Sequence, residues 1–485
     1  MKKNKKKILM MSDDLRMHSG VAVMSKEIVM GAIHHYDFVQ IGGSVKHPEE
    51  GKIVDMSQAV RESIGVKDAY LKIYPTSGYG SQDMLRQIIE IEKPDAVLHY
   101  TDPRFWLWFY QMEHEIRTKI PIFYYEIWDD LPDPKYNRDY YLSCDLLMAI
   151  SKQTYGINKR LVPEFEDWQI TYVPHGINTE KFFKINPNNS DFIKFKKEYD
   201  LDEYDFKILY LNRNIRRKVP GDVVMAYKHF VEQLPKNKQK KCVLIFHTAP
   251  VDDNGTDLRV VCKTLIPDQN VIFTYDKGGP FDDIKMNYLY NAIDVYVNIA
   301  SNEGFGLGSA EALTVGKPII VNVTGGLQDQ CGFKKRVETS DGDTTINTLK
   351  YLTPDDYIEL GSNHQGKYKK HGKWAKPVWP KTLSLLGSPP TPYIFDDRCR
   401  WDEVGDAMKE WYDVGVEERE RCGELGRKFV CEKDVGMTAK EMCNRFIESM
   451  DSAFEKWKPK SLYDLIKIED NIKEDISIKV IGDQA

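Results

Sequence analysis

The chain has 485 residues, a length that predicts two or three domains and a large buried core. Hydrophobic residues make up 41% and charged residues 29% of the chain, which is typical of a globular protein. The formal net charge of −6 argues against a protein that binds nucleic acid through bulk electrostatics. The lysine-rich first residues, MKKNKKK, are typical of a solvated tail.

No stretch reaches the ~18 consecutive apolar residues that a membrane helix requires, so we expect no stable membrane insertion. The apolar run at residues 8–11 is too short for a signal peptide and fits a first strand better. The cysteines form no CxxC pair, and the histidines form no ligand cluster. We therefore expect reduced thiols, no protein metal site and a cytoplasmic protein.

Short apolar runs, each followed by a segment with helical periodicity, recur along the chain. Strands of this kind that alternate with helices indicate parallel sheets covered on both faces. The expected strands are residues 7–12, 38–42, 96–100, 122–128, 146–150, 170–173, 207–211, 243–247, 271–275, 295–299 and 318–323. They are too many for one doubly wound sheet, so the predicted fold is α/β, with two Rossmann-like domains that face each other across a cleft.

The segment at residues 173–191 is rich in Pro, Gly, Asn and Ser, and it separates the sixth expected strand from the seventh, as a hinge would. The predicted domains are therefore residues 1–178 and residues 179–440. Residues 325–400 are expected to be an irregular insertion whose aromatic content keeps it ordered. Residues 441–485 are expected to form a helix and tail that pack back on the first domain.

The segment NEGFGLGSAEALTVGKPII begins at residue 302 and places Glu303 and Glu311 around a loop with three glycines. A helix is expected to begin near Gly306, and the free amides of a helix N-terminus suit a phosphate. The Glu311 carboxylate can accept two hydroxyl hydrogen bonds, as a ribose diol requires. The alternative is a turn with two solvated acids.

A second cluster, LNRNIRRK, follows the first strand of the second domain and includes Arg213, Arg216, Arg217 and Lys218. Arg offers planar bidentate donors and Lys offers a mobile point charge, a combination that suits a diphosphate. The alternative is a solvated basic turn, but the position beyond the carboxyl end of a strand favours the functional interpretation.

These two clusters together resemble the retaining glycosyltransferases of the GT-B fold, especially glycosyltransferase family 4. The segments VPHGINTEKF and GKPIIVNVTGGLQD resemble that family's interdomain segment and the strand after its two-glutamate loop. The resemblance implies that Arg213 and Lys218 neutralise the leaving diphosphate of a nucleotide sugar. It also implies that Glu303 contacts the donor sugar and that Glu311 holds the ribose hydroxyls.

The resemblance further implies that five more residues bind the nucleotide-sugar donor, some of them through backbone amides. These residues are Gly20, Asn214, Phe305, Gly306 and Leu307. The sequence departs from the family pattern in two places. One glycine stands after the first strand where the family often has a pair, and Val219 and Pro220 intervene before the glycine that often follows the diphosphate lysine directly.

The acceptor side has weaker signals, which follow the strands of the first domain. Asp129 in YYEIWDDLPDP is the first candidate for a residue near the reacting sugar, with Glu126 behind it. His99, Asp102 and His18 also follow strands, but each is expected more often as a structural residue. The aromatic run RFWLWFY at residues 104–110 fits a buried helix better than a membrane-facing patch.

The resulting hypothesis is a retaining glycosyltransferase that moves a sugar from a nucleotide sugar, such as a UDP- or GDP-sugar, to an unidentified hydroxyl acceptor. The resemblance implies front-face attack, and no metal is required if cations and helix amides carry the diphosphate charge. Two alternatives stay open: a nucleotide-sugar epimerase or hydrolase of the same fold, and a non-catalytic nucleotide-sugar-binding protein. Nucleic acid enters only as a possible acceptor, through a modified base in DNA.

Overall fold

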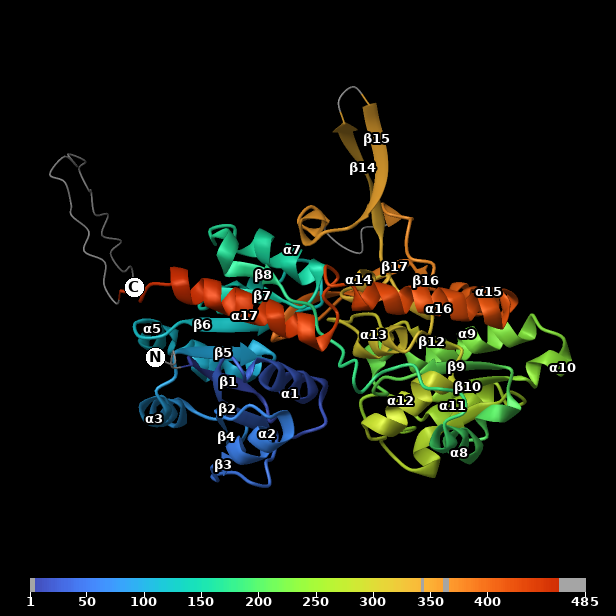
Figure 1. The fold of residues 1–485 in the computed structure, drawn as a ribbon. Helices are drawn as coiled ribbons and strands as arrows, with labels where there is room; N and C mark the ends of the chain where they lie inside the picture. Colours follow the sequence, from blue (N-terminus) through green and yellow to red (C-terminus); the bar gives the residue numbers. More distant parts are fainter. Residues whose placement is uncertain (1–4, 342–343, 361–365, 462–485) are drawn as a thin grey trace, which may run out of the picture.

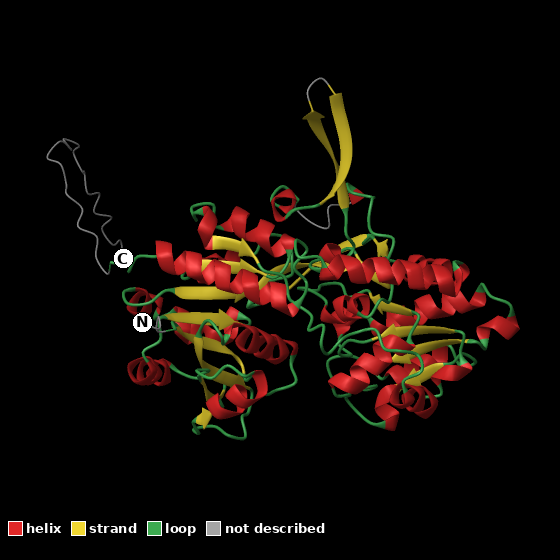
Figure 2. Ribbon diagram, viewed as in Figure 1, coloured by secondary structure: helices red, strands yellow, loops and turns green. Residues whose placement is uncertain are grey.

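The computed structural model describes residues 5–341, 344–360 and 366–461, which form two α/β units side by side (Figure 1). Each unit is built on a sheet of mostly parallel strands, and helices flank both sheets (Figure 2). The predicted fold class is therefore confirmed. The eleven strands expected from the apolar runs all form, with their ends shifted by a few residues at most.

The first sheet has eight strands among the described residues, in the spatial order β3-β4-β2-β1-β5-β6-β7-β8. Its pairs are parallel except for the short edge pair of β3 with β4. The strands are β1 (Lys7–Asp13), β2 (Asp37–Ser44), β3 (Val54–Asp55), β4 (Leu71–Ser77), β5 (Ala96–Tyr100), β6 (Ile122–Glu126), β7 (Leu146–Ala149) and β8 (Ile170–Tyr172).

The second sheet has six strands among the described residues, in the order β11-β10-β9-β12-β13-β16, and all its pairs are parallel. The strands are β9 (Phe206–Tyr210), β10 (Cys242–Phe246), β11 (Val271–Phe273), β12 (Val295–Asn298), β13 (Ile319–Asn322) and β16 (Ala375–Val378). Pro377 lies in β16, which is consistent with its place at the edge, because proline has no N–H for a further partner.

The helices follow the strands in both units. In the first unit they are α1 (Gly20–Ala32), α2 (Ser57–Ile64), α3 (Gln82–Glu92), α4 (Leu107–Tyr110), α5 (Glu113–Arg117), α6 (Arg138–Leu142) and α7 (Lys152–Leu161). After residue 178 they are α8 (Ser190–Glu198), α9 (Pro220–Glu232), α10 (Lys236–Gln239), α11 (Leu258–Leu265), α12 (Asp283–Ala292), α13 (Leu307–Thr314), α14 (Leu327–Gln330), α15 (Trp401–Asp413), α16 (Gly415–Cys431) and α17 (Ala439–Lys456).

The last described helix, α17, returns from the second unit and lies over the first (Figure 1). The Cys443 thiol donates to the Glu27 carbonyl on α1, and a Cβ at Gly31 would lie only 2.2 Å from the Cys443 Sγ. The Tyr36 hydroxyl also donates to Asp451 at 2.6 Å. Residues 462–485 of the predicted tail lie outside the described residues, and the predicted domain limits stay a prediction.

The sequence predicted an irregular insertion at residues 325–400. This prediction is wrong, because much of the segment pairs into strands. One antiparallel hairpin, β14 (Lys334–Asp341) with β15 (Thr344–Tyr351), projects away from the body (Figure 1). A second hairpin joins β17 (Thr382–Ser388) to β18 (Thr391–Arg398). Trp374 anchors the segment: it is 5% exposed, stacks on Phe429 and donates to the Gln330 carbonyl at 2.9 Å.

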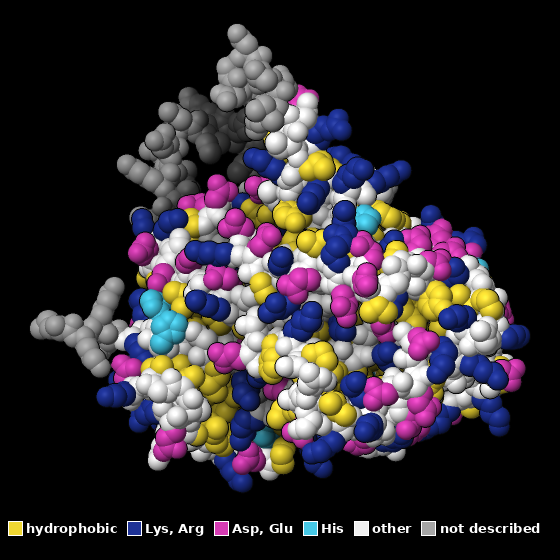
Figure 3. Space-filling view, turned by 45° about the vertical axis from the view of Figure 1, so that its right-hand side comes forward, with side chains coloured by type: hydrophobic (Ala, Val, Ile, Leu, Met, Phe, Trp, Pro, Cys, Tyr) yellow, Lys and Arg dark blue, Asp and Glu magenta, His cyan; other side chains and the backbone are white. Residues whose placement is uncertain are grey.

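The aromatic run at residues 104–110 is split between core and surface. Trp106, Phe109 and Tyr110 are buried, whereas Phe105 and Leu107 are about half exposed. No helix within the described part of the chain is long and apolar enough to span a bilayer. Basic and acidic side chains are interspersed over the face shown in Figure 3, so this face carries no broad surface of one charge sign.

Candidate active site

A cleft of about 1020 Å³ lies between the two units and is lined by both. The loops that follow β1, β5 and β6 line one side, and the loops that follow β9 and β12 line the other. This is the place where parallel α/β sheets present ligand-binding loops, because the carboxyl ends of parallel strands share one edge.

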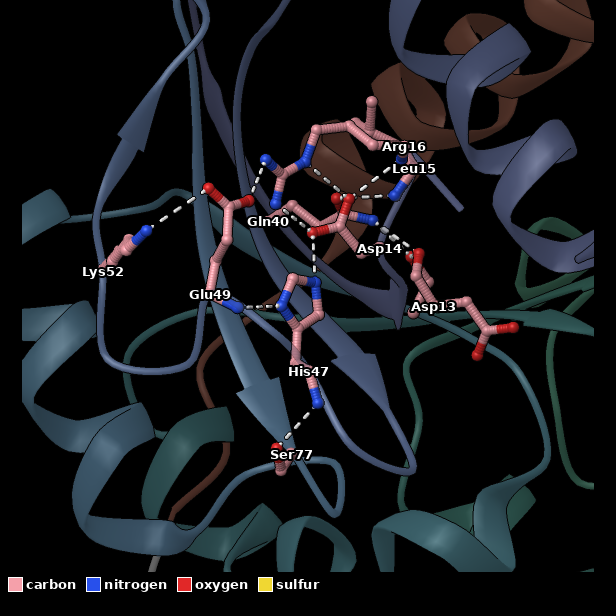
Figure 4. Close-up of polar contacts among 10 residues, drawn as sticks. Asp13, Asp14, Leu15, Arg16, Gln40, His47, Glu49, Lys52 and Ser77 are labelled. Atoms are coloured by element: carbon pink, nitrogen blue, oxygen red, sulfur yellow. Dashed lines mark hydrogen bonds and ion pairs between the residues drawn. The ribbon is translucent and has the colours of Figure 1, made fainter. Parts of the chain in front are cut away.

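The loop after β1 is held by a buried polar cluster around Asp14 (Figure 4). The Asp14 carboxylate accepts from Arg16 at 2.7 Å and lies 3.1 Å from the His47 Nε2. Arg16 also contacts Glu49 at 2.6 Å. Burial would raise the pKa of Asp14, but the hydrogen bonds and charge of Arg16 outweigh it and lower the pKa below its ordinary value. Asp13 points away from this cluster (Figure 4).

The same loop leads into the N-terminus of α1 at the cleft. Ser19 caps the helix by accepting from the Ala22 amide at 3.0 Å, and Gly20 is the first residue of the helix. A Cβ at Gly20 would lie 3.7 Å from Leu307 Cδ1, across the cleft in the second unit. Gly20 therefore faces the second unit across the cleft, and its donor-binding role stays a prediction.

The glycine-rich loop of the second unit ends at Gly306, which precedes α13 with a φ of +88°. A side chain is disfavoured there by this backbone conformation, and its Cβ would meet Leu327 at 2.5 Å. The Gln330 side chain donates to the carbonyls of Phe305 and Gly306 at 2.6 and 3.1 Å. Leu307 is the first residue of α13, so the helix begins where the sequence predicted.

Lys218 and Glu303 form an ion pair inside the cleft. Lys218 lines the cleft and is only 6% exposed, so its charged group is largely shielded from solvent. Burial would raise the pKa of Glu303, but Lys218 and the nearby Arg217 outweigh it and lower the pKa. Glu303 is therefore an anion held between two cations.

The other basic residues of the cluster have different surroundings. Arg213 lines the cleft, its side chain is 65% exposed, and it pairs with Asp252 at 2.9 Å. Arg217 donates to the Asn302 carbonyl at 2.7 Å. Asn214 does not line the cleft: it is fully buried, and its amide donates to backbone carbonyls of the loop at residues 249–256. Its side chain supports the loop, and a direct donor contact stays a prediction.

Glu311 lies on α13 one turn beyond Gly308 and is not itself part of the cleft lining. The Tyr290 hydroxyl donates to it at 2.6 Å, which fixes one carboxylate oxygen. Burial raises the pKa of Glu311 to about 7, although the Tyr290 hydrogen bond opposes this shift. The group therefore changes charge close to neutral pH.

The acceptor-side candidates fall into two groups: residues that line the cleft and residues that are buried in the first unit. Asp129 lines the cleft, with its Oδ2 3.8 Å from Arg217. Asp102 and the exposed His18 line it as well. Glu126 and His99 are fully buried in the first unit and do not reach the cleft lining. Burial raises the pKa of Glu126 to about 8 and lowers that of His99 to about 3, so both are neutral near pH 7.

Three cleft residues were missed by the sequence interpretation: Asp130, Asn302 and His175. The Asn302 amide donates to Asp130 across the two units. His175 hydrogen-bonds the Tyr125 hydroxyl at 2.6 Å, and its ring lies 5.3 Å from that of Phe305. The only sequence signals were adjacency to Asp129 and Glu303, and the place of His175 in VPHGINTEKF.

Metal-ligand clusters of three or more His, Cys, Asp or Glu residues do not occur in the part of the chain that the structure describes. All eight cysteines are free, and Cys431 is the exposed one.

The family model described as "Glycosyl transferases group 1" matches residues 191–337. The chain is 26% identical over 187 residues to alpha-monoglucosyldiacylglycerol synthase of Acholeplasma laidlawii, a stretch that covers 39% of this chain and 44% of that protein. The chain thus matches less than half the length of this curated relative.

Solved structures resemble most of the chain in fold. A glycosyltransferase from Rickettsia africae superposes with a TM-score of 0.60 at 14% identity, covering 94% of this chain and 100% of the other. A sucrose-phosphate synthase from Thermosynechococcus elongatus gives 0.62 at 14% identity, covering 93% and 100%. An E. coli structure with bound UDP-2-fluoro glucose gives 0.58 at 11% identity, covering 94% and 100%. The matches confirm the predicted resemblance and fold.

Proposed function

We propose, on the premise that residues 191–337 belong to the glycosyl transferases group 1 family, that this protein moves a sugar from a nucleotide sugar to a hydroxyl acceptor with retention of configuration. The observation that carries the proposal is the cleft itself. It brings together the cations of the β9 loop, the glycine-rich N-terminus of α13 and the first-unit loop with Asp129.

The donor would bind mainly to the second unit. Arg213, Arg217 and Lys218 face the cleft and supply positive charge for the diphosphate, so this arrangement does not require a metal. The first amides of α13 add hydrogen-bond donors, and donors fixed before the reaction stabilise charge that develops on a leaving phosphate. In the proposed front-face step, the acceptor oxygen bonds to the anomeric carbon as the phosphate oxygen leaves and takes the acceptor's proton.

A uracil nucleotide is the first donor to test, because a fold relative is described as bound with UDP-2-fluoro glucose. The rival functions give different results in one assay of purified protein with UDP-glucose. Nucleotide release that depends on an added hydroxyl compound supports transfer, whereas release without an acceptor indicates hydrolysis. Donor binding without turnover would indicate a sensor.

We expect donor affinity to rise with pH because of Glu311. Its pKa is raised to about 7, and only the charged carboxylate can accept both ribose hydroxyl hydrogen bonds. The ionised fraction rises from about one tenth at pH 6 to about nine tenths at pH 8, so the UDP-glucose Kd should fall by up to roughly tenfold. Calorimetry at both pH values measures this.

The matched variant Glu311→Gln keeps the shape but does not titrate, so its Kd should not follow this pH trend. Glu311→Ala should weaken binding at pH 8 by ~1.5–3 kcal/mol, because a charged acceptor is lost. Equal Kd values for wild type and Glu311→Ala at pH 8 would rule out the ribose role.

The stereochemistry of the product tests the front-face step. An inverting enzyme needs a base on the face opposite the leaving phosphate, and the first candidate for one, Asp129, lies 3.8 Å from the Arg217 guanidinium. This contact engages the Asp129 carboxylate, which weakens it as a candidate base. We therefore expect an α-linked first product from UDP-α-glucose, measured by proton NMR of the anomeric coupling. A β-linked first product would refute the retaining mechanism.

A further inference from the structure

The hairpin of β17 and β18 forms part of the cleft wall, although it belongs to the second unit's insertion. In a β-strand, alternate side chains lie on one face, and directly paired residues share that face. Ile394, Asp396 and Arg398 alternate along β18 and all line the cleft. Leu386 on β17 pairs with Ile394 and lines it too. One face of the hairpin therefore faces the cleft.

This hairpin is fixed to the first unit as well. The Phe395 amide donates to the Leu131 carbonyl at 2.5 Å, and the Tyr136 hydroxyl donates to the Tyr393 carbonyl at 2.9 Å. The Tyr136 and Tyr393 rings lie 4.9 Å apart, edge to face. On the second unit, the Asn302 amide donates to the Phe395 carbonyl at 2.7 Å. The hairpin is thus held beside the loop that carries Asp129.

The cleft face of the hairpin changes character along its length. At its base, Arg398 donates to Asp396 at 2.9 Å and lies 3.9 Å from Asp222, so this end is charged and polar. Toward its tip, Leu386 and Ile394 are apolar, and Leu386 is 50% exposed. The first unit adds further apolar lining with Trp128 and Ile127.

We propose that the hairpin selects an amphiphilic acceptor, in which a hydroxyl head is joined to a hydrocarbon tail. The proposal rests on the proposed function, because it assigns the acceptor for the same cleft. The hydroxyl head lies toward Asp129 and the charged base of the hairpin. The tail lies against Leu386 and Ile394, where it removes exposed apolar surface from water.

The test uses n-alkyl β-D-glucopyranosides from methyl to octyl, below their micelle concentrations, with calorimetry on the full chain in the presence of UDP. We expect binding to tighten by roughly two- to fourfold for each added methylene until the tail extends past the wall. In Leu386→Asp and in Ile394→Ala this dependence on tail length should fall by at least half.

Leu385→Asp is the matched control, because Leu385 is 61% exposed on the neighbouring position of β17 and does not line the cleft. Leu385→Asp should show the same dependence of alkyl glucoside affinity on tail length as the wild type. Binding that does not change with tail length in wild type, or an equal loss in the Leu385→Asp control, overturns the proposal. Melting temperatures of all variants identify any loss that comes from unfolding.

UDP-glucose binding measured on the same preparations separates this inference from the proposed function. Tail-dependent binding without any UDP-glucose binding would refute the donor assignment and leave the apolar subsite standing. UDP-glucose binding without tail dependence would refute the hairpin proposal alone.

Discussion

Lys218→Ala is expected to lower turnover by about 10²- to 10³-fold at saturating UDP-glucose, the range observed when one fixed donor to a developing anion is removed. Lys218 is buried in the cleft, where its charge is weakly screened, and it faces the position proposed for the leaving diphosphate. The measurement is the rate of UDP release in the presence of a hydroxyl acceptor.

The substitution also removes the partner of Glu303, so stability must be measured beside turnover. The double variant Lys218→Met/Glu303→Gln leaves no unpaired charge and shows how much of a stability loss comes from the isolated carboxylate. Arg213→Ala is the control within the cluster. Its side chain is 65% exposed, so its loss should cost less than about tenfold in turnover. Wild-type turnover in folded Lys218→Ala would refute the diphosphate role.

Asp14→Ala is expected to destabilise the protein by about 3–5 kcal/mol, because it leaves Arg16 without its buried partner and removes the acceptor beside His47. The loop that leads to Gly20 would lose its main anchor, so donor or acceptor binding should weaken as well. Urea unfolding followed by the fluorescence of the chain measures the stability change.

Glu49→Ala is the matched control, because Glu49 contacts Arg16 at the exposed side of the same cluster. The Glu49→Ala substitution should lower the free energy of unfolding by less than about 1 kcal/mol. The pH dependence gives a second check. The pKa of Asp14 is lowered in the folded protein, so its stabilising effect is complete above the unfolded value near 3.9 and is lost as pH falls through the folded pKa. Equal stability of wild type and Asp14→Ala at pH 7 would contradict the prediction.

The sequence was most informative about local structure. The signal for a strand, an apolar run followed by helical periodicity, is contained in a short stretch of sequence of roughly ten residues or more. All eleven strands expected from this signal form. The start of α13 at Leu307 also followed from local glycines and helix formers. β4 was missed because LKIYPTS mixes polar residues and a proline into the strand. In the segment at residues 325–400, β14 and β15 were missed because they contain few apolar residues, and β16, β17 and β18 were missed because each contains a proline or a glycine.

The site shows the same division between local and long-range information. The sequence identified Glu303, Lys218, Gly306 and Asp129 because short motifs carry them, and the structure places all four in one cleft. Their pairing is a tertiary property. Lys218 and Glu303 are separated by 85 residues, and Asn302 and Asp130 by 172, so no local pattern could reveal either contact.

By itself, the sequence determined the α/β class and the order of eleven strands along the chain, because backbone preference and apolar periodicity are local. Only the tertiary structure decided which charged groups are buried and paired. It paired the buried Lys218 with Glu303, placed Glu126 and His99 outside the cleft lining, and brought the β17–β18 hairpin against the first unit. The physical reason is that burial and pairing depend on long-range packing, and these set the charge of each group.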